Sequence, residues 1–373
     1  MKNFIKYTLA VASLALVAAC GGGGGGGGGG VSTGFTQNYV ASASQGEVIT
    51  YSVNTTAMTY EYKVIKSQYG CELPTSNCHS GSGTLTRNSD GTYTPSGSAD
   101  TRIFALQNGL LVGTIKLGTM PATPLIGIPN PIDNAEKLAG TYNYNSIQCP
   151  SKSNGMMTGC SGGHGSLTIS AVSATTISYN ICVSADIENS NRVCSSTSTG
   201  TGTLDPVYKK WKFYRTGSTQ ENYAVAFNAN NNQKVAFLDF NDPGGYGYGQ
   251  AALSEKVAAV PADLEKNLGR WFMVSLAPGR NSGYAVITVE RDGGIRTVQP
   301  DGSISTTTAI PNTPWNGFFS LSTDPNNRGL MAGDGLFSMT SPNDLGGNAK
   351  YFLGMKMDYK SACHWFDSAP VPL

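Results

Sequence analysis

Apolar and polar residues alternate along most of this 373-residue chain, and this alternation constrains its fold more than any other pattern. The clearest runs are Tyr60-Tyr62-Val64, Leu167-Ile169-Ala171, Ile177-Tyr179-Ile181, Tyr223-Val225-Phe227, Ala285-Ile287-Val289 and Tyr351-Leu353-Met355. A period of two over four to eight residues is typical of a half-buried β-strand. Turn signals such as Asn108-Gly109 and Asp301-Gly302 separate the runs, so most connections are short and favour antiparallel meanders. The sequence predicts an all-β fold with few short helices.

Two segments repeat at an offset of about 130 residues. Residues 131–142 and 261–271 share the order Pro-x-Asp, Glu-Lys, Leu, Gly-x-aromatic, which predicts a short helix followed by a strand. The match continues from 164–169 to 282–287 and from 225–227 to 319–321. It favours two related meander domains, and the alternative is convergence between two unrelated meanders.

Leu138 to Tyr142 and Leu268 to Trp271 resemble the first strand of lipocalin-like barrels. The resemblance implies that the aromatic residue closes one end of a barrel and that the glycine lets the backbone pass close by. An open sheet or a sandwich packed against a neighbouring unit is the alternative.

The first twenty residues have the parts of a secretory signal. Lys2 and Lys6 precede an apolar run at 7–17, which is too short for a bilayer span of ~20 residues. Gly21 to Gly30 follow as an unbroken glycine run. Such a run has no side chains to bury and high backbone entropy, so we interpret it as a flexible tether. A slippage-prone repeat without function is the alternative.

Val17-Ala18-Ala19-Cys20 resembles the lipobox of bacterial lipoproteins. The resemblance implies that Cys20 becomes the mature N-terminus, carries acyl chains such as palmitate, and anchors the protein to a membrane. Gly21 in place of Asp implies, by the same resemblance, the outer membrane of a Gram-negative cell, on either its periplasmic or its outer face. A plain secretory signal with an incidental cysteine is the alternative.

These observations divide the chain into six expected segments. They are a signal peptide (1–19), lipidated Cys20 with the poly-Gly tether (20–35), a smaller N-terminal β unit (36–120), a Pro-rich linker (121–133), a disulfide-bearing β domain (134–254) and a possible duplicate of it (255–373).

Cysteine usage agrees with export from the cytoplasm. Three close pairs predict disulfides: Cys71 with Cys78, Cys149 with Cys160, and Cys182 with Cys194. Six cysteines permit 15 connectivities, and proximity favours this one. The third pair is best supported, because it lies across an expected two-strand hairpin. Cys363 is left as a buried thiol or an intermolecular partner.

No motif predicts a catalytic residue, a cofactor or a metal ligand. Gly159-Cys160-Ser161-Gly162-Gly163 fits the G-x-S-x-G pattern but lacks the helix that a nucleophile elbow requires. Residues 239–245 and 324–327 collect oxygen ligands, yet Asx turns explain them more simply than calcium. The Gly-Tyr segment 244–249 predicts a mobile loop, and the alternatives are stacking on sugars or contact with a partner surface. We expect Trp211, Trp271 and Trp315 to pack in the core.

Charged residues make up 13% of the chain and the net charge is +1, so no basic surface for nucleic acid is expected. The sequence therefore favours an outer-membrane-anchored lipoprotein with a non-enzymatic role. That role is structural, or is binding of an unknown protein, glycan or small apolar ligand. Two alternatives stay open: a hydrolase of envelope glycan or peptide, and a lipocalin-like carrier with an apolar cavity of about 300 Å³ or more.

Overall fold

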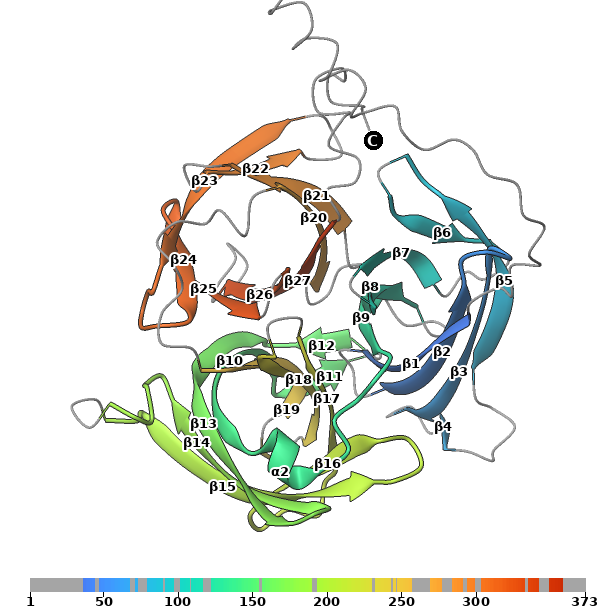
Figure 1. The fold of residues 1–373 in the computed structure, drawn as a ribbon. Helices are drawn as coiled ribbons and strands as arrows, with labels where there is room; N and C mark the ends of the chain where they lie inside the picture. Colours follow the sequence, from blue (N-terminus) through green and yellow to red (C-terminus); the bar gives the residue numbers. More distant parts are fainter. Residues whose placement is uncertain are drawn as a thin grey trace, which may run out of the picture.

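The alternating segments form three closed antiparallel β-barrels, seen here in a computed structural model (Figure 1). The structure describes residues 36–357 except for 44–46, 68–70, 73–78, 90, 97–100, 108, 117–121, 154–155, 190–192, 230–231, 243, 246, 257–268, 277–283, 291–293, 299–302, 333–334 and 342–348. Within these residues one short helix accompanies the strands. The prediction of an all-β fold is confirmed. Cys20, the glycine run, the helix expected near 261–268 and Cys363 lie outside the described residues.

Barrel 1 is built from the N-terminal unit. Its strands are β1 (Thr36–Ala43), β2 (Glu47–Asn54), β3 (Thr59–Ser67), β5 (Ser80–Arg87), β6 (Tyr93–Pro95), β7 (Thr101–Gln107), β8 (Leu110–Ile115) and β9 (Thr123–Ile128). The short strand β4 (Cys71–Glu72) pairs antiparallel with the end of β3. Pairing of β1 with β9 and of β2 with β3 closes the ring. Strand β9 lies inside the segment 121–133 that was expected to be a linker. Its one proline, Pro124, stands next to the strand's start, where a proline is tolerated, and the strand is buried throughout.

Barrel 2 follows directly. Its strands are β10 (Gly140–Cys149), β13 (Ser161–Ser173), β14 (Thr176–Val183), β15 (Ser196–Asp205), β16 (Lys210–Arg215), β17 (Asn222–Asn228), β18 (Lys234–Asp242) and β19 (Gly247–Glu255). A hairpin of β11 (Ser151–Ser153) and β12 (Met156–Thr158) fills the loop between Cys149 and Cys160.

Helix α2 (Ala135–Leu138) packs into the interior of barrel 2. Asn134 caps it, because its Oδ1 accepts hydrogen bonds from the backbone N–H groups of Glu136 and Lys137. Trp211, fully buried among the same residues, donates from Nε1 to the carbonyl of Ile132 at 2.9 Å. The interior is therefore filled by the protein's own side chains.

Barrel 3 repeats the strand order of barrel 2. Its strands are β20 (Gly269–Leu276), β21 (Tyr284–Val289), β22 (Gly294–Val298), β23 (Ile304–Pro311), β24 (Phe318–Leu321), β25 (Asp324–Ala332), β26 (Leu336–Ser341) and β27 (Lys350–Lys356).

The two barrels correspond in a register that differs from the one expected from the sequence. Tyr142 pairs with Leu167 and Trp271 pairs with Ile287, so Leu167, not Ile169, is the counterpart of Ile287. Residues 225–227 lie on the sixth strand of barrel 2, whereas 319–321 lie on the fifth strand of barrel 3. That part of the sequence match is wrong. A shift of two residues leaves every side chain on the same face, so alternation alone could not detect it.

Aromatic rings lie over cross-strand glycines inside all three barrels. A side chain at Gly81, Gly165 or Gly329 would collide with Tyr62, Tyr144 or Phe319 respectively. Because glycine has no Cβ, each ring can pack directly against the glycine backbone, and a narrow barrel can accommodate large aromatic residues.

One apolar cluster joins the outer faces of the three barrels. Val112 and Ile126 contribute from barrel 1, Val225 and Phe237 from barrel 2, and Phe272 and Leu353 from barrel 3. Figure 1 shows the barrels arranged around this junction. Several alternating stripes therefore face neighbouring barrels and not a barrel interior, which makes the molecule one packed body.

Candidate binding cleft between the second and third barrels

Polar side chains on the outer face of β10 hold barrel 3 against barrel 2. Asn143 accepts a hydrogen bond from Trp315 Nε1 at 2.9 Å and donates to the carbonyl of Asn316 at 2.9 Å. Asn145 donates to the carbonyls of Arg328 and Ser338 at 3.1 and 3.0 Å. These bonds place Trp315 and Asn316, which precede β24, at the edge of the seam.

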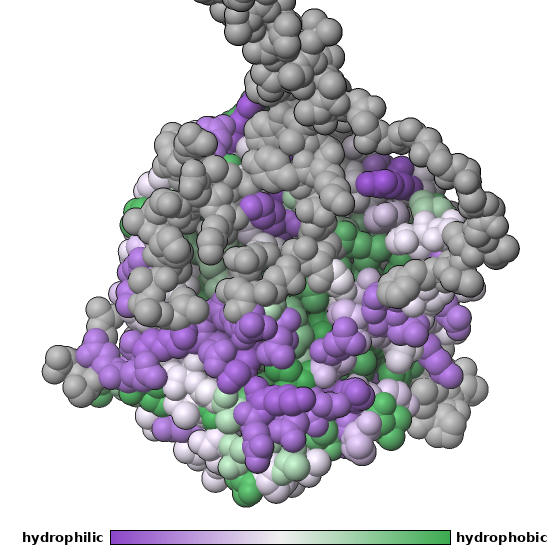
Figure 2. Space-filling view, viewed as in Figure 1, coloured by the Kyte–Doolittle hydropathy of each residue, from purple (hydrophilic) through white to green (hydrophobic). Residues whose placement is uncertain are grey.

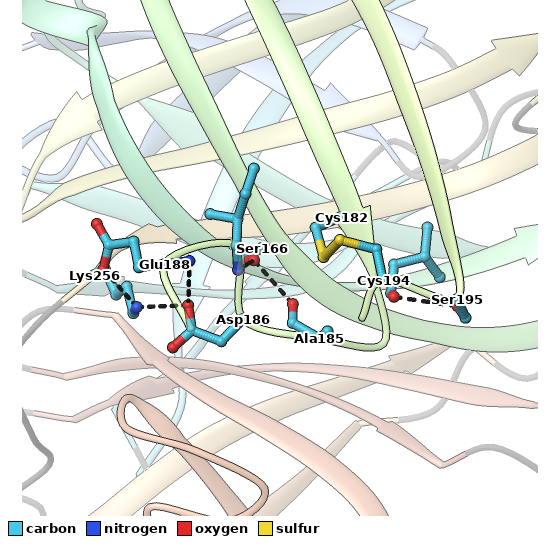
Figure 3. The surroundings of a disulfide bond; sticks show 10 residues. Ser166, Cys182, Ala185, Asp186, Glu188, Cys194, Ser195 and Lys256 are labelled. Carbon is cyan, nitrogen blue, oxygen red and sulfur yellow. Dashed lines mark hydrogen bonds and ion pairs between the residues drawn. A yellow bond between two sulfur atoms is a disulfide. The ribbon is translucent and has the colours of Figure 1, made fainter. Parts of the chain in front are cut away.

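A disulfide-closed loop forms the opposite wall (Figure 3). Cys182 at the end of β14 is bonded to Cys194 before β15, with Cα atoms 5.1 Å apart. Ser166 on β13 fixes the loop: its Oγ donates to the carbonyl of Ala185 and accepts from the N–H of Ile187. The loop backbone is therefore anchored by one covalent bond and two hydrogen bonds.

Between these walls lies a cleft of about 620 Å³. It is lined by Thr141, Asp186, Glu188, Asn189, Glu255, Lys256, Trp315 and Asn316. Figure 2 shows hydrophilic residues gathered in a band over the boundary between barrels 2 and 3. The volume is within the range of about 300–1,000 Å³ typical of ligand pockets, but the lining is far more polar than usual.

Ion pairs organise the charges of the cleft. Lys256 Nζ lies 2.6 Å from Asp186 Oδ1 and 2.5 Å from Glu188 Oε2. Glu255 Oε1 lies 2.8 Å from Lys234 Nζ. Burial alone would lower the pKa of Lys256, but the two carboxylates outweigh burial and raise it, so the ammonium stays charged. Three carboxylates thus face two ammonium groups, and the cleft carries an excess negative charge.

His164 packs behind Trp315 at the same seam. Its ring centroid lies 5.7 Å from that of Trp315 and 6.2 Å from that of Phe318. Burial, with a smaller contribution from Arg328, lowers the pKa of His164 to about 4. The imidazole is neutral near pH 7 and serves as a packing partner of barrel 3.

The residues singled out from the sequence mostly have structural roles. Ser161 is exposed at the start of β13 and leads into a strand, so the G-x-S-x-G match builds no nucleophile elbow. Asp239 is buried on β18, and Asp324 Oδ1 accepts the N–H of Asn326 in an Asx turn. Tyr248 is partly buried and packs against the apolar cluster that joins the three barrels. The described residues hold no group of three or more His, Cys, Asp or Glu side chains suited to a metal.

Trp211, Trp271 and Trp315 are all buried in apolar clusters, as expected, and Trp315 also contributes to the lining of the cleft. Two close cysteine pairs, Cys149–Cys160 and Cys182–Cys194, are bonded. Cys78, and hence the pair Cys71–Cys78, lies outside the described residues.

The sequence-based interpretation missed Asp186, Glu188, Glu255 and Lys256. The available signal was the pair of acidic residues inside a hairpin loop closed by two cysteines. Their lysine partner is about 70 residues further along the chain and gives no local hint. Among the described residues, no helix has the length and apolar character needed to span a membrane.

Comparison with known proteins finds remote structural similarities, two of which follow. No protein-family model and no curated protein matches the sequence. A protein of unknown function from the DUF3598 family of Nostoc punctiforme aligns over 60% of this chain and 97% of its own, with 12% identity and a TM-score of 0.21. Transferrin binding protein B from serogroup B Neisseria meningitidis aligns over 84% of this chain and 66% of its own, with 11% identity and a TM-score of 0.23. These scores are too low to assign a fold family or a function.

Proposed function

We propose that this protein is a non-enzymatic binding protein of the cell envelope and that the cleft between barrels 2 and 3 holds its ligand. The observation that carries the proposal is the cleft itself, about 620 Å³ in volume and walled by side chains held in place by hydrogen bonds and a disulfide. Pre-formed walls reduce the entropy that a ligand must lose on binding.

The lining favours a polar ligand that is neutral or cationic, and a glycan fits best. Carboxylate and amide groups from Asp186, Glu188 and Asn189 can accept and donate hydrogen bonds to several hydroxyl groups. The exposed part of the Trp315 ring adds a small apolar surface that the C–H groups of a sugar can contact. The excess negative charge disfavours anionic ligands.

The ion pairs favour binding over hydrolysis. A glycan hydrolase needs one carboxyl group kept protonated beside a second that is free to act as base or nucleophile. Here Asp186 and Glu188 both form ion pairs with the same ammonium group of Lys256, so neither carboxyl group is set apart from the other in this way. The filled interior of barrel 2 likewise gives no support to a carrier of an apolar ligand.

The N-terminus supplies the proposed location. We propose that Cys20 is acylated and that the glycine run tethers the three-barrel body to the outer membrane. Mass spectrometry of the mature N-terminus tests this: a diacylglyceryl-modified Cys20 is expected, and an unmodified residue 20 would refute the anchor.

Ligand binding is tested by thermal unfolding of the full-length protein with malto-oligosaccharides, chitosan oligomers and polygalacturonate oligomers as neutral, cationic and anionic probes. We expect the neutral or the cationic series to raise the unfolding temperature and the anionic series to leave it unchanged. Glu188→Gln should weaken cationic binding at least threefold. Glu136→Gln, exposed on α2 and not part of the cleft lining, is the matched control. Failure of every saccharide at millimolar concentration, or equal binding by the Glu188→Gln protein, would reject the cleft.

A further inference from the structure

Lys210 is a buried lysine at the seam between barrels 1 and 2. It begins β16, points outward from barrel 2 and is only 3% exposed. Its Nζ lies 4.2 Å from the ring centroid of Tyr223 and 5.5 Å from that of Tyr208. Among the described residues, Nζ has no hydrogen-bond acceptor and no ion-pair partner.

The nearest carboxylate is already bound to other groups. Glu221 accepts from Lys66 Nζ at 2.7 Å, from Tyr214 at 3.0 Å and from the hydroxyl of Tyr223, and it lies 3.8 Å from Lys212 Nζ. Burial opposes its ionisation, yet these hydrogen bonds bring the pKa of Glu221 down to about 2. Its charge is therefore shared among several donors, of which Lys66 is the closest ammonium group.

Asp205, which lies directly opposite Lys210 on β15, also has hydrogen-bond partners of its own. Its Oδ1 accepts the backbone N–H groups of Val207 and Tyr208 at 3.0 and 3.2 Å. The charged groups that act on Lys210 are thus two further lysines and two carboxylates, and both carboxylates have other partners. The cation–π contacts with Tyr223 and Tyr208 offset only part of the cost of burying an ammonium group without a hydrogen-bond acceptor.

We propose that Lys210, Lys66 and Lys212 form a binding site for a phosphate-type oxyanion at the seam of barrels 1 and 2. Lys66 and Lys212, whose side chains are 28% and 31% exposed, form an accessible rim, and Lys210 forms the floor. Lysine binds phosphate as a compact point charge, and three ammonium groups against two carboxylates leave a net positive charge that favours an anion. Because Lys66 belongs to barrel 1, a bound anion would also strengthen the contact between the two barrels.

Protonation of Lys210 gives the site a pH signature. Burial, reinforced by Lys66 and Lys212 and opposed by Asp205 and Glu221, lowers the pKa of Lys210 to about 8. Lys210 loses its charge above this pH, so anion affinity should fall between about pH 7 and pH 9.5. Sulfate, whose charge is constant over this interval, is the probe for that measurement.

The site is tested by isothermal titration of the full-length protein with inorganic phosphate at constant ionic strength in potassium chloride. Saturable one-site binding is expected, with an affinity at least tenfold lower in Lys210→Met. Lys209→Met is the matched control, because Lys209 is exposed and paired with Asp133 at 2.9 Å. If Lys210→Met does not fold, Lys212→Met must show a several-fold loss instead.

Glycerol 3-phosphate and a short-chain phosphatidylglycerol, below its micellar concentration, distinguish the two sources of the anion. Tighter binding of the lipid than of phosphate would identify a lipid headgroup, and the reverse order would identify free phosphate. The proposal is overturned if the wild-type protein shows no saturable phosphate binding, or if Lys210→Met binds as tightly as Lys209→Met. This test is independent of the saccharide cleft, so either site can fail alone.

Discussion

Asn145 and Ser338 hydrogen-bond to each other in both directions across the seam between barrels 2 and 3. Asn145 Nδ2 donates to the Ser338 carbonyl at 3.0 Å, and Ser338 Oγ donates to Asn145 Oδ1 at 2.7 Å. Both residues are almost fully buried. The reciprocal pair fixes how the two barrels sit and thereby determines the shape of the cleft above it.

Replacing Asn145 with alanine should lower the free energy of unfolding by about 2–4 kcal/mol, since it leaves the carbonyls of Arg328 and Ser338 and the hydroxyl of Ser338 without their partner. Urea unfolding measures the change. Asn180→Ala, at an exposed position on β14, is the control and should stay within about 0.5 kcal/mol of wild type. Equal effects of the two substitutions would show that the seam bond adds no stability.

Asp239 should make stability fall as pH rises. Its carboxyl is fully buried, accepts from Gln250 at 2.9 Å and from Ser42 of barrel 1, and burial raises its pKa well above the ordinary value. The unfolded chain loses this proton near pH 4 while the folded protein keeps it, so stability is lost from pH 4 up to the raised pKa.

Asp239→Asn should therefore be more stable than wild type at alkaline pH, by an amount that shrinks toward pH 4. Asp242→Asn is the contrasting variant on the same strand, because Asp242 is buried beside Arg215 at 3.4 Å. It should be less stable than wild type at neutral pH. Urea midpoints from pH 4 to 9 compare the two, and stabilisation by both substitutions would contradict this account of Asp239.

His164 should have the opposite pH dependence. Its pKa falls from about 6.5 in the unfolded chain to about 4 in the folded protein, so acid favours the unfolded state between these values. The loss on acidification is at most about 3 kcal/mol, since one pKa unit corresponds to about 1.4 kcal/mol. His164→Phe should remove this slope relative to wild type, whereas His79→Asn, at an exposed site, should leave it intact. An unchanged slope in His164→Phe would refute the assignment.

Removing the Cys182–Cys194 disulfide should loosen the wall of the cleft. A Cys182→Ser, Cys194→Ser double variant should lose about 2–4 kcal/mol of stability and become sensitive to proteases within residues 183–193. The double variant Cys149→Ser, Cys160→Ser is the control. Its cysteines lie in the apolar cluster that joins the three barrels, so it should lose stability without new cleavage within residues 183–193. Limited proteolysis followed by mass spectrometry separates the two outcomes.

The sequence predicted the positions of the strands better than how the strands pair. Alternation located the strands around Leu167 and Leu353, and cysteine proximity identified the Cys182–Cys194 bond. Closure of barrel 1 was missed because β9 lies in a Pro-rich stretch. Strand register was missed because period two is insensitive to a shift of two residues.

The cleft could not be predicted because its parts come from distant segments. Asn143 and Asn145 alternate with tyrosines on β10 and look solvent-facing in sequence, yet a second barrel covers them. Asp186 and Lys256 meet only because β14 and β19 lie in the same closed barrel. Such pairings depend on closure and packing, which local patterns do not encode.

Hydrogen–deuterium exchange of the full-length protein, with and without the oligosaccharide that binds best, tests the central claim most directly. Occupation of the cleft predicts slower exchange at residues 186–189, 255–256 and 315–316, with no change in β5 or β6 of barrel 1. Protection confined to other segments, or none at saturating ligand, would contradict a ligand site between barrels 2 and 3.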